Sequence, residues 1–496
     1  MKVECDVLVV GAGNAGLCAA LAAADEGATV IVLERAPEAE RGGNSAFTAG
    51  AMRVAYDGVE DLRDLMPHLT DEEVAVTDFG SYPEDAFFSD IAKVTEYRAD
   101  PDMAELLVSR SFKTLKWMCT KGVRFLPIYG RQAFKVDGRF KFWGGLTVET
   151  NGGGPGLVES LFAAARAAEI EVWYEARAVS LLADDQGVHG VEVRRQGRTQ
   201  EVRAGAVVLA AGGFEANAEW RARYLGRGWD LAKVRGSRFN TGDGIKMALD
   251  AGAMPYGNWS GCHAVGWDRN APEFGDLAVG DGYQKHSYPF GIMLNAHGRR
   301  FVDEGADFRN YTYAKYGHVI LEQPGQFAWQ IFDQTVTRLL RDEYRIRQVT
   351  KVTGDTLEEL VGKLDGVDAD AALRTIHEFN DSVRTDVPFD PNVLDGRKAH
   401  LPLPKSNWAN PLAAPPFEAY QVTCGITFTF GGLRIDVNGQ VIDTEDRLMP
   451  GLYACGELVG GIFYFNYPGG SGLTSGSVFG RLAGTSAAAA AVAGRR

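Results

Sequence analysis

The hydrophobic residues of this chain gather into short, continuous runs of β-branched and aliphatic side chains. The run VLVV at 7–10 begins close to the N-terminus, VIVL follows at 30–33, and VVLAAGG lies at 207–213. Continuous apolar runs of this length are typical of strands buried on both faces of a parallel sheet. Between the first two runs, residues 17–27 are rich in Ala and Leu and predict a helix that ends at Gly27. The order of strand, helix and strand predicts an α/β fold with a Rossmann-like sheet.

The turn between the first strand and the helix carries three glycines in the spacing G-x-G-x-x-G. We expect Gly11 to allow a tight turn, Gly13 to let a pyrophosphate approach the backbone, and Gly16 to let the helix pack closely on the strand. The amides that open the helix would then point at the phosphates. Glu34 ends the second strand, where a carboxylate can accept hydrogen bonds from ribose hydroxyls. The pattern predicts a dinucleotide site.

The segment after Glu34 distinguishes between the two dinucleotides, NAD and FAD, that suit this motif. Residues 41–50 read RGGNSAFTAG, with two glycines and a run of small polar residues. The long FAD molecule needs such a segment to pass its phosphates and flavin ring, whereas NAD enzymes usually continue with another crossover helix. The segment holds no histidine, so we expect the FAD to be bound non-covalently.

The C-terminal residues 451–473 (GLYACGELVGGIFYFNYPGGSGL) return to this glycine-rich style. We expect Glu457 to accept hydrogen bonds from the ribityl chain of the flavin. The backbone of 471–473 would open the last helix, with its amides facing the flavin O2. The residues predicted to contact FAD are Gly11, Gly13, Asn14, Ala15, Gly16, Glu34, Arg35, Gly42, Gly43, Asn44, Ser45, Val179, Ala211, Gly212, Gly213, Asp243, Gly456, Glu457, Ser471, Gly472 and Leu473.

The middle of the chain has a different character from its two ends. Beyond about residue 256 the sequence holds many aromatic residues, and it leaves this region through the Pro-rich segment PLPKSNWANPLAAPP. We interpret this part as an α+β cap domain inserted into a Rossmann-like, glutathione-reductase-type FAD-binding domain. The predicted boundaries are 1–255 and 406–496 for the two parts of the FAD-binding domain and 256–405 for the substrate cap.

Composition and charge exclude several classes of function. The net charge is −14 and no basic face is evident, which argues against a nucleic-acid partner. No apolar stretch is long enough to span a membrane, and the N-terminus enters a strand at once, which predicts a cytoplasmic protein without a signal peptide. The six cysteines show no C-x-x-C and the eight histidines no metal spacing, so we expect neither an iron–sulfur cluster nor a metal. Electrons must therefore pass to an external acceptor.

The chain resembles the flavoprotein family of succinate dehydrogenase, fumarate reductase and 3-ketosteroid Δ1-dehydrogenase over nearly its whole length. The motifs occur in family order: the N-terminal fingerprint with RGGNS, AAGGF at 210–214, TGDG at 241–244, GRRFVDE at 298–304 and the final GLYACGE…PGGSG. Within the family, the segments 290–317, 422–432 and 463–473 look most like FAD-dependent tricarballylate dehydrogenases. Those enzymes convert tricarballylate to cis-aconitate and pass electrons to a membrane iron–sulfur partner.

The resemblance implies catalytic or binding roles for Arg309, Tyr467 and His263. Arg309 matches the arginine that serves as the acid in fumarate reductases, with a small spacing difference in DEGADFR. An arginine can carry protons only if it is buried beside acids, and Asp303 and Glu304 are near in sequence. Otherwise it would be a carboxylate clamp or a surface ion pair. His263 matches a substrate-binding histidine, although a lone histidine is often only a packed, hydrogen-bonded residue.

Tyr467 sits where fumarate reductases carry a second substrate-binding arginine. In ketosteroid dehydrogenases a tyrosine in a similar setting draws a proton from the carbon next to a carbonyl, which requires a lowered phenol pKa. Phe428 falls near the position of a carboxylate-binding histidine of fumarate reductases, and Thr427 replaces its neighbour. The loss of both cationic groups argues against simple fumarate or succinate chemistry. The alternative role for Tyr467 is an aromatic wall against the flavin.

The favoured hypothesis is an FAD-dependent dehydrogenation of a CH–CH bond beside a carboxylate or carbonyl, with hydride passing to flavin N5 and the proton to Arg309 or Tyr467. The substrate would be a small polycarboxylate or ketone, and the electron acceptor an external protein, such as a membrane iron–sulfur protein that would hold the enzyme at the membrane periphery. A ketosteroid-type or other ketone desaturase and an enoate reductase working in reverse remain open. The segment 41–50 and the C-terminal motif disfavour an NAD-dependent dehydrogenase.

Overall fold

The structure, a computed structural model, describes residues 3–143 and 145–493. Its first sheet has eight strands and contains the three apolar runs. They form β1 (Val3–Val10), β2 (Val30–Leu33) and the end of β12 (Arg198–Leu209). β1 pairs in parallel with both β2 and β12, and Val7 lies opposite a residue of each. The predicted Rossmann-like sheet is confirmed.

The same sheet joins residues from both ends of the chain. β20 pairs in parallel with the end of β12, where Leu452 lies opposite Val207. The C-terminal motif is thereby placed beside the N-terminal one. The remaining strands are β9 (Glu171–Trp173), β10 (Arg177–Asp184), β11 (Gly187–Arg195), β19 (Gln440–Ile442) and β20 (Leu448–Ala454).

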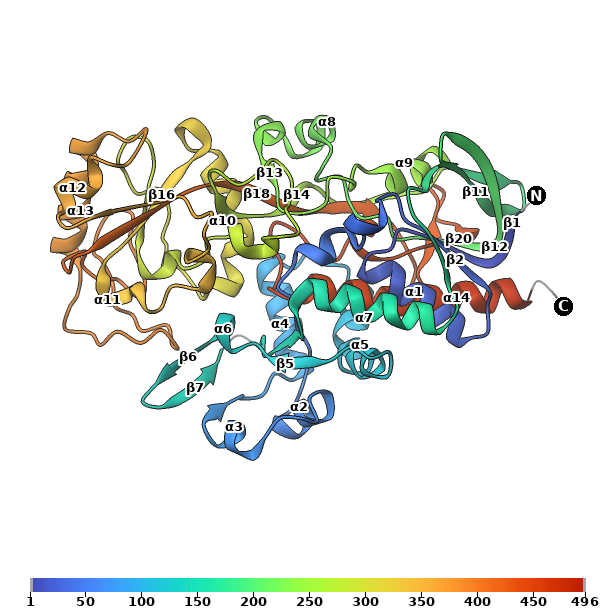
Figure 1. Ribbon diagram of the computed structural model, residues 1–496, viewed down its shortest axis with the longest axis horizontal. Coiled ribbons are helices and arrows are strands. Elements are labelled where there is room, and N and C mark those ends of the chain that lie inside the picture. Colours follow the sequence, from blue (N-terminus) through green and yellow to red (C-terminus); the bar gives the residue numbers. More distant parts are fainter. Residues whose placement is uncertain (1–2, 144, 494–496) are drawn as a thin grey trace.

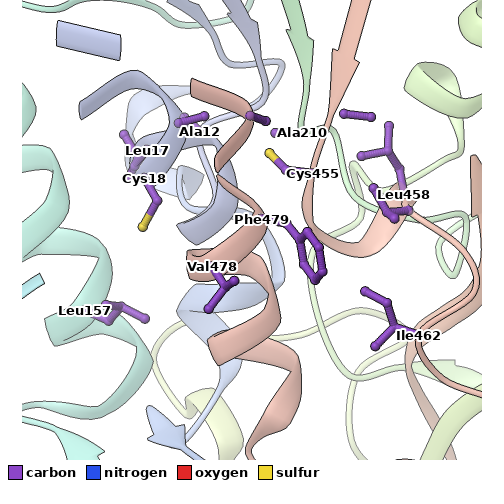
Figure 2. Packing of buried hydrophobic residues seen from close by; sticks show 14 of the residues in the cluster. Ala12, Leu17, Cys18, Leu157, Ala210, Cys455, Leu458, Ile462, Val478 and Phe479 are labelled. Atoms are coloured by element: carbon purple, nitrogen blue, oxygen red, sulfur yellow. The ribbon is translucent and has the colours of Figure 1, made fainter. Parts of the chain in front are cut away.

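Two helices from opposite ends of the chain, α1 (Asn14–Asp25) and α14 (Ser471–Ala493), pack against each other beside this sheet. A glycine allows the close contact, because a Cβ at Gly480 would collide with the backbone carbonyl of Ala15. Figure 2 shows the apolar side chains around α14, among them Phe479. The first turns of both helices are therefore held side by side, and residues from both line the same cavity.

A second sheet of six strands extends from the centre of the molecule toward its other end, where α12 and α13 lie (Figure 1). Its central strand, β18, pairs with four of the others and is 17 residues long. At a rise of about 3.3 Å per residue it spans roughly 55 Å, so it reaches from this sheet back toward the first one. The strands are β13 (Lys233–Val234), β14 (Pro255–Asp268), β15 (Ile292–Leu294), β16 (Ala328–Phe332), β17 (Lys351–Gly354) and β18 (Phe417–Leu433).

The other elements cover the two sheets or connect them. Several helices begin at side chains that cap them; Asp368, for example, accepts a hydrogen bond of 2.9 Å from the Ala371 amide. The helices are α2 (Val59–Leu65), α3 (Asp71–Ala75), α4 (Glu84–Val94), α5 (Pro101–Thr120), α6 (Tyr129–Gln132), α7 (Gly153–Ala167), α8 (Ala218–Trp220), α9 (Asp243–Asp250), α10 (Tyr313–Leu321), α11 (Gln334–Thr337), α12 (Leu357–Val361) and α13 (Ala369–Ser382). The short strands are β3 (Ala51–Met52), β4 (Thr77–Asp78), β5 (Phe125–Pro127), β6 (Ala133–Val136), β7 (Arg139–Phe142) and β8 (Val148–Thr150).

The division of the chain into domains stays a proposal. We propose that 1–255 and 406–496 form one domain and 256–405 the cap, with β13 and β18 extending the cap sheet beyond those boundaries. Within the ranges that the structure describes, no helix is both long and apolar enough to cross a membrane.

Candidate active site

A cleft of about 860 Å³ opens where β1, β2 and β12 end. Ligands of open α/β sheets bind at this carboxyl edge of parallel strands. Most of the residues predicted to contact a dinucleotide line the cleft. They are Gly11, Gly13, Asn14, Ala15, Glu34, Arg35, Gly43, Asn44, Ser45, Ala211, Gly212, Asp243, Gly456 and Glu457.

A smaller group of the predicted contact residues does not line this cleft or the adjoining cavity. The neighbouring residue Ala178 lines the cleft and Val179 does not, because successive side chains of β10 point to opposite faces. Gly16 instead packs on the carbonyl of Gly11, which is the helix-packing role predicted for it. The residues outside the lining are Gly16, Gly42, Val179, Gly213 and Ser471.

Gly13 provides a test of whether a nucleotide fits the cleft. Its φ of −78° suits any residue, and the atoms nearest to an added Cβ would be 3.6 and 3.7 Å away. Neither backbone strain nor packing against the protein therefore requires glycine at this position. A side chain would instead occupy the floor of the cleft, where a pyrophosphate needs close access to the backbone. The bare floor fits FAD.

Glu34 is buried at the end of β2 and faces the turn after β1. Its Oε2 accepts a hydrogen bond of 3.0 Å from the Ala12 amide, and its Oε1 accepts one of 2.7 Å from the Ala36 amide. Burial raises the pKa of this carboxyl, an effect that the backbone donors oppose. The two amides fix the carboxylate in the position predicted for contact with a ribose.

Asp243, at the start of α9, lies between two arginines on the rim of the cleft. Its carboxylate pairs with Arg35 at 2.9 Å and with Arg177 at 2.9 Å. Arg35 belongs to the predicted set, and Arg177 adds a cation that sequence reasoning did not identify.

A second cavity of about 1230 Å³ continues the cleft toward the cap. The two share lining residues on α1 and in the segment 44–45, and both contact Gly456 and Glu457. Gly472 and Leu473, in the first turn of α14, line the second cavity as predicted. The combined space is elongated, as a dinucleotide with a terminal ring system requires.

A buried glutamate, Glu215, and a partly buried one, Glu457, meet where the cleft and the cavity join. Glu457 Oε1 accepts a hydrogen bond of 2.9 Å from the Thr429 amide. Glu215 Oε1 accepts bonds of 2.7 Å from Asn44 Nδ2 and 2.6 Å from Asn240 Nδ2. Burial raises the pKa of both carboxyls. Glu215 raises the pKa of Glu457 further, whereas the hydrogen bond with Glu457 opposes the shift of Glu215. Two adjacent buried carboxyls cannot both ionise readily, so the pair holds a proton.

Arg309 lies at the cap side of the cavity and is 8% exposed. Its Nη2 donates to the Arg131 carbonyl at 2.8 Å, and its Nη1 is 3.2 Å from His286 Nδ1. Its Nε has no partner among the residues that the structure describes. Burial lowers the pKa of this guanidinium, and Glu343 opposes the shift.

The acids expected beside Arg309 face other groups. Glu304 pairs with Arg300, with 3.1 Å between Oε1 and Nε. Asp303 accepts a bond of 3.0 Å from the Ser406 amide. The expectation from sequence proximity was wrong. Residues 303–304 and Arg309 lie in one segment of turns, and their side chains contact different groups. Glu343, distant in sequence, is the acid that acts on Arg309.

His263, on β14, is 1% exposed and lies among aromatic rings. The ring centroids of Tyr467, Tyr313 and Phe428 are 4.7, 5.0 and 5.3 Å from its own. Neither of its nitrogens has a partner among the described residues. Burial, with a contribution from Arg235, holds the pKa of His263 well below its usual value, so the ring is neutral.

Tyr467 lines the same cavity, and its hydroxyl is hydrogen-bonded to that of Tyr313. Burial raises the pKa of Tyr467, although the bond to Tyr313 and the charge of Arg235 oppose the shift. The lowered phenol pKa that a base would need is therefore not what the structure gives. Arg309, Tyr467 and His263, far apart in sequence, line one cavity, and their roles in catalysis stay a prediction.

Sequence reasoning missed three charged residues that line this cavity, Arg131, Arg235 and Asp281. Arg235 follows the two-residue strand β13, and Arg131 lies in the one-turn helix α6. Neither stands in a motif or in a periodic pattern. The one available signal was the position of Arg235 six residues before the TGDG turn at 241–244.

Comparison with known proteins agrees with this geometry. The model of the FAD binding domain family matches residues 6–473. The chain is 31% identical over 494 residues to a fumarate reductase (cytochrome) of Shewanella frigidimarina, covering 97% of this chain and 77% of the relative. It is 26% identical over 579 residues to the 3-oxosteroid 1-dehydrogenase of Mycolicibacterium smegmatis, covering 99% of each.

Among solved structures, the open conformation of a flavocytochrome c3 fumarate reductase has a TM-score of 0.73 at 27% identity, covering 99% of this chain and 79% of that one. The predicted flavoprotein family, the FAD-binding fold and FAD as cofactor are confirmed. The chain belongs to the FAD binding domain family and is an FAD-dependent oxidoreductase of the fumarate reductase and 3-ketosteroid dehydrogenase type.

Proposed function

We propose that this enzyme acts on the CH–CH bond of a polycarboxylate and dehydrogenates a tricarballylate-like substrate to a cis-aconitate-like product. The observation that carries the proposal is the set of three guanidinium groups, from Arg131, Arg235 and Arg309, that line one cavity next to the flavin site. Guanidinium groups bind carboxylates through paired, charge-assisted hydrogen bonds.

The charges of the cavity support an anionic substrate. Asp281 pairs with two of the three arginines, Arg131 and Arg235, and Glu457 belongs to the pair that holds a proton. Burial and the neighbouring cations hold the pKa of His263 and His286 well below the usual range, so both rings are neutral. A single aspartate provides less negative charge than these guanidinium groups require, and a bound polycarboxylate would offset the cost of the remaining buried charge.

We assign the proton transfer to Arg309 and a binding role to Tyr467. Bound FAD supplies the hydride acceptor. A group must be deprotonated before it can accept the proton of the carbon beside a carboxylate. Burial lowers the pKa of Arg309, which favours its neutral guanidine form, and raises the pKa of Tyr467, which disfavours the phenolate. Tyr467, kept neutral, donates a hydrogen bond. His263, with both nitrogens free of protein partners among the described residues, would orient a second carboxylate.

The FAD is proposed to be non-covalent, since segment 41–50 offers no histidine. The electrons would pass to an external acceptor, for which an iron–sulfur protein is the first choice. Retention of yellow colour after acid precipitation of the protein would contradict the non-covalent assignment.

A second candidate, a ketone desaturase, is favoured by one observation. The paired hydroxyls of Tyr313 and Tyr467 form a neutral donor that could hold a carbonyl oxygen. The likeness to a 3-oxosteroid 1-dehydrogenase supports the same alternative. The reverse reaction, reduction of an enoate, would use the same residues with an electron donor in place of the acceptor.

The test is anaerobic bleaching of flavin absorbance near about 450 nm, which reports hydride arrival at the cofactor. Tricarballylate and a 3-ketosteroid are added to separate samples of the holoenzyme. Bleaching by tricarballylate alone supports the polycarboxylate assignment. Bleaching by the steroid alone would instead support the ketone desaturase assignment.

A further inference from the structure

We propose that Arg131 and Arg235, oriented by Asp281, form a subsite for a third carboxylate and so select tricarboxylates over dicarboxylates. The inference rests on the proposed function and adds to it the residues that decide the substrate class. The subsite is separate from Arg309, to which we assign proton transfer.

Arg235 and Asp281 form a buried ion pair in which two guanidinium nitrogens share one carboxylate oxygen. Nε and Nη2 of Arg235 lie 2.7 and 2.6 Å from Asp281 Oδ1, and both side chains are less than a tenth exposed. Nη1 of Arg235 donates to Thr427 Oγ1 at 3.2 Å. A guanidinium has five N–H groups, and these contacts use three of them. Asp281 therefore fixes the direction of Arg235 without using all its donors.

Arg131 approaches the same carboxylate from another part of the chain. Its Nη1 lies 2.9 Å from Asp281 Oδ2, and Gln284 also donates to that oxygen. The carbonyl of Arg131 accepts from Arg309 Nη2 at 2.8 Å. One aspartate thus orients two cations, one on α6 and one after β13, toward a common space beside Arg309.

One carboxylate cannot neutralise two guanidinium groups. The surrounding charged groups come from several elements. Two further acids act on Arg131, namely Glu343 and Glu149, and Glu343 acts on Arg309 and Arg341 as well. The chain itself therefore offsets the positive charge around the cavity only in part. The groups facing this space are Arg131, Arg235, His263, Asp281, His286, Arg309, Tyr313, Glu457 and Tyr467.

Unpartnered polar atoms indicate that a ligand completes the site. Arg309 Nε and both nitrogens of His263 are buried without partners among the described residues. Buried polar groups in proteins almost always have a hydrogen-bond partner, so we infer that a bound ligand provides the partners of these atoms. They provide contacts for two carboxylates, and the Arg131–Arg235 pair provides the place for a third.

The experiment compares two ligands that differ by one carboxylate, cis-aconitate and the glutaconate isomer of the same double-bond geometry. Both are unsaturated and do not reduce oxidised flavin, so calorimetry on the oxidised holoenzyme gives a dissociation constant for each. The variants are Arg131→Gln and Arg235→Gln. Arg238→Gln is the control, since Arg238 lies in the same segment but forms an exposed pair with Glu40.

We expect either variant to weaken aconitate binding by about 10- to 100-fold, the range of one charge-assisted contact, and glutaconate binding by less than about threefold. The control should change neither. Equal losses for both ligands, or no loss, would overturn the subsite. If Arg235→Gln does not fold, Arg131→Gln, at a partly exposed side chain, decides alone. A wild-type enzyme that binds neither acid would instead remove the polycarboxylate function itself.

Discussion

The nucleotide cleft and the substrate cavity share a wall but are built in different ways. The cleft is made largely of backbone and small side chains from continuous motifs at 11–16, 41–50 and 451–457. The cavity is made of large, charged and aromatic side chains from separate elements, such as α6, β14 and α10.

The difference follows from what each region has to bind. A pyrophosphate is recognised by amides and by the absence of side chains, which a local turn can supply. Carboxylates beside a reacting carbon need cations fixed in three dimensions, which no single turn can hold. The cleft should therefore be sensitive to added volume, and the cavity to lost charge.

The largest effect should come from adding volume to the cleft. In Gly13→Val we expect FAD affinity to fall by about 100-fold or more, because the side chain fills the floor on which the pyrophosphate lies. Flavin content after purification and the far-ultraviolet circular dichroism spectrum measure binding and folding separately. Gly58→Val, at an extended glycine with open space around its Cβ, is the control. A Gly13→Val protein that still binds FAD and is yellow would contradict the expectation that the cleft is sensitive to added volume.

Loss of charge in the cavity should leave the cofactor in place. Arg309→Ala should slow flavin reduction by roughly 10²- to 10⁴-fold, the usual contribution of a proton carrier, while flavin content stays at the wild-type level. Stopped-flow absorbance under anaerobic conditions gives the rate. A wild-type rate of flavin reduction would contradict the assignment of proton transfer to Arg309. Loss of FAD would show that the cleft and the cavity do not act independently.

Tyr467→Phe should have a smaller effect, about fivefold on the same rate, because one neutral hydrogen bond is worth about 1 kcal/mol. The phenyl ring keeps the contacts with His263 and Phe428. A loss of about 10³-fold would instead make Tyr467 the proton carrier, as in the ketone desaturase alternative.

The smallest effect concerns pH and the junction of the two regions. The raised pKa of Glu215 means that the folded protein holds a proton that the unfolded chain releases at about pH 4–5. Its contribution to stability is present below that pH and is lost as pH rises toward the folded pKa. Glu215→Gln should therefore flatten the fall in the free energy of unfolding of the apoprotein as the pH rises above about 5.

Urea denaturation at several pH values measures this slope. Glu159→Gln removes a carboxylate of which 61% is exposed and should leave the slope unchanged. Parallel curves for the wild type and Glu215→Gln would contradict a shared proton between Glu215 and Glu457.

The sequence by itself determined the first sheet, the FAD cofactor and most of the cleft lining. Strand hydrophobicity, glycine spacing and the acid at Glu34 are local properties, and each acts through the backbone of its own segment. The resemblance also led to Arg309, Tyr467 and His263, which the fold brings together. The error at Val179 was one position, because side-chain direction alternates along β10.

Only the tertiary structure decided which charges face the substrate. Arg131 and Arg235 are 104 positions apart, and Asp281 lies on a third segment, so no spacing in the chain relates them. The same is true of Glu343 as the acid that acts on Arg309 and of Glu215 as the partner of Glu457. The free energy of a buried charge depends on its neighbours in space, and these are fixed only when the sheets and helices pack.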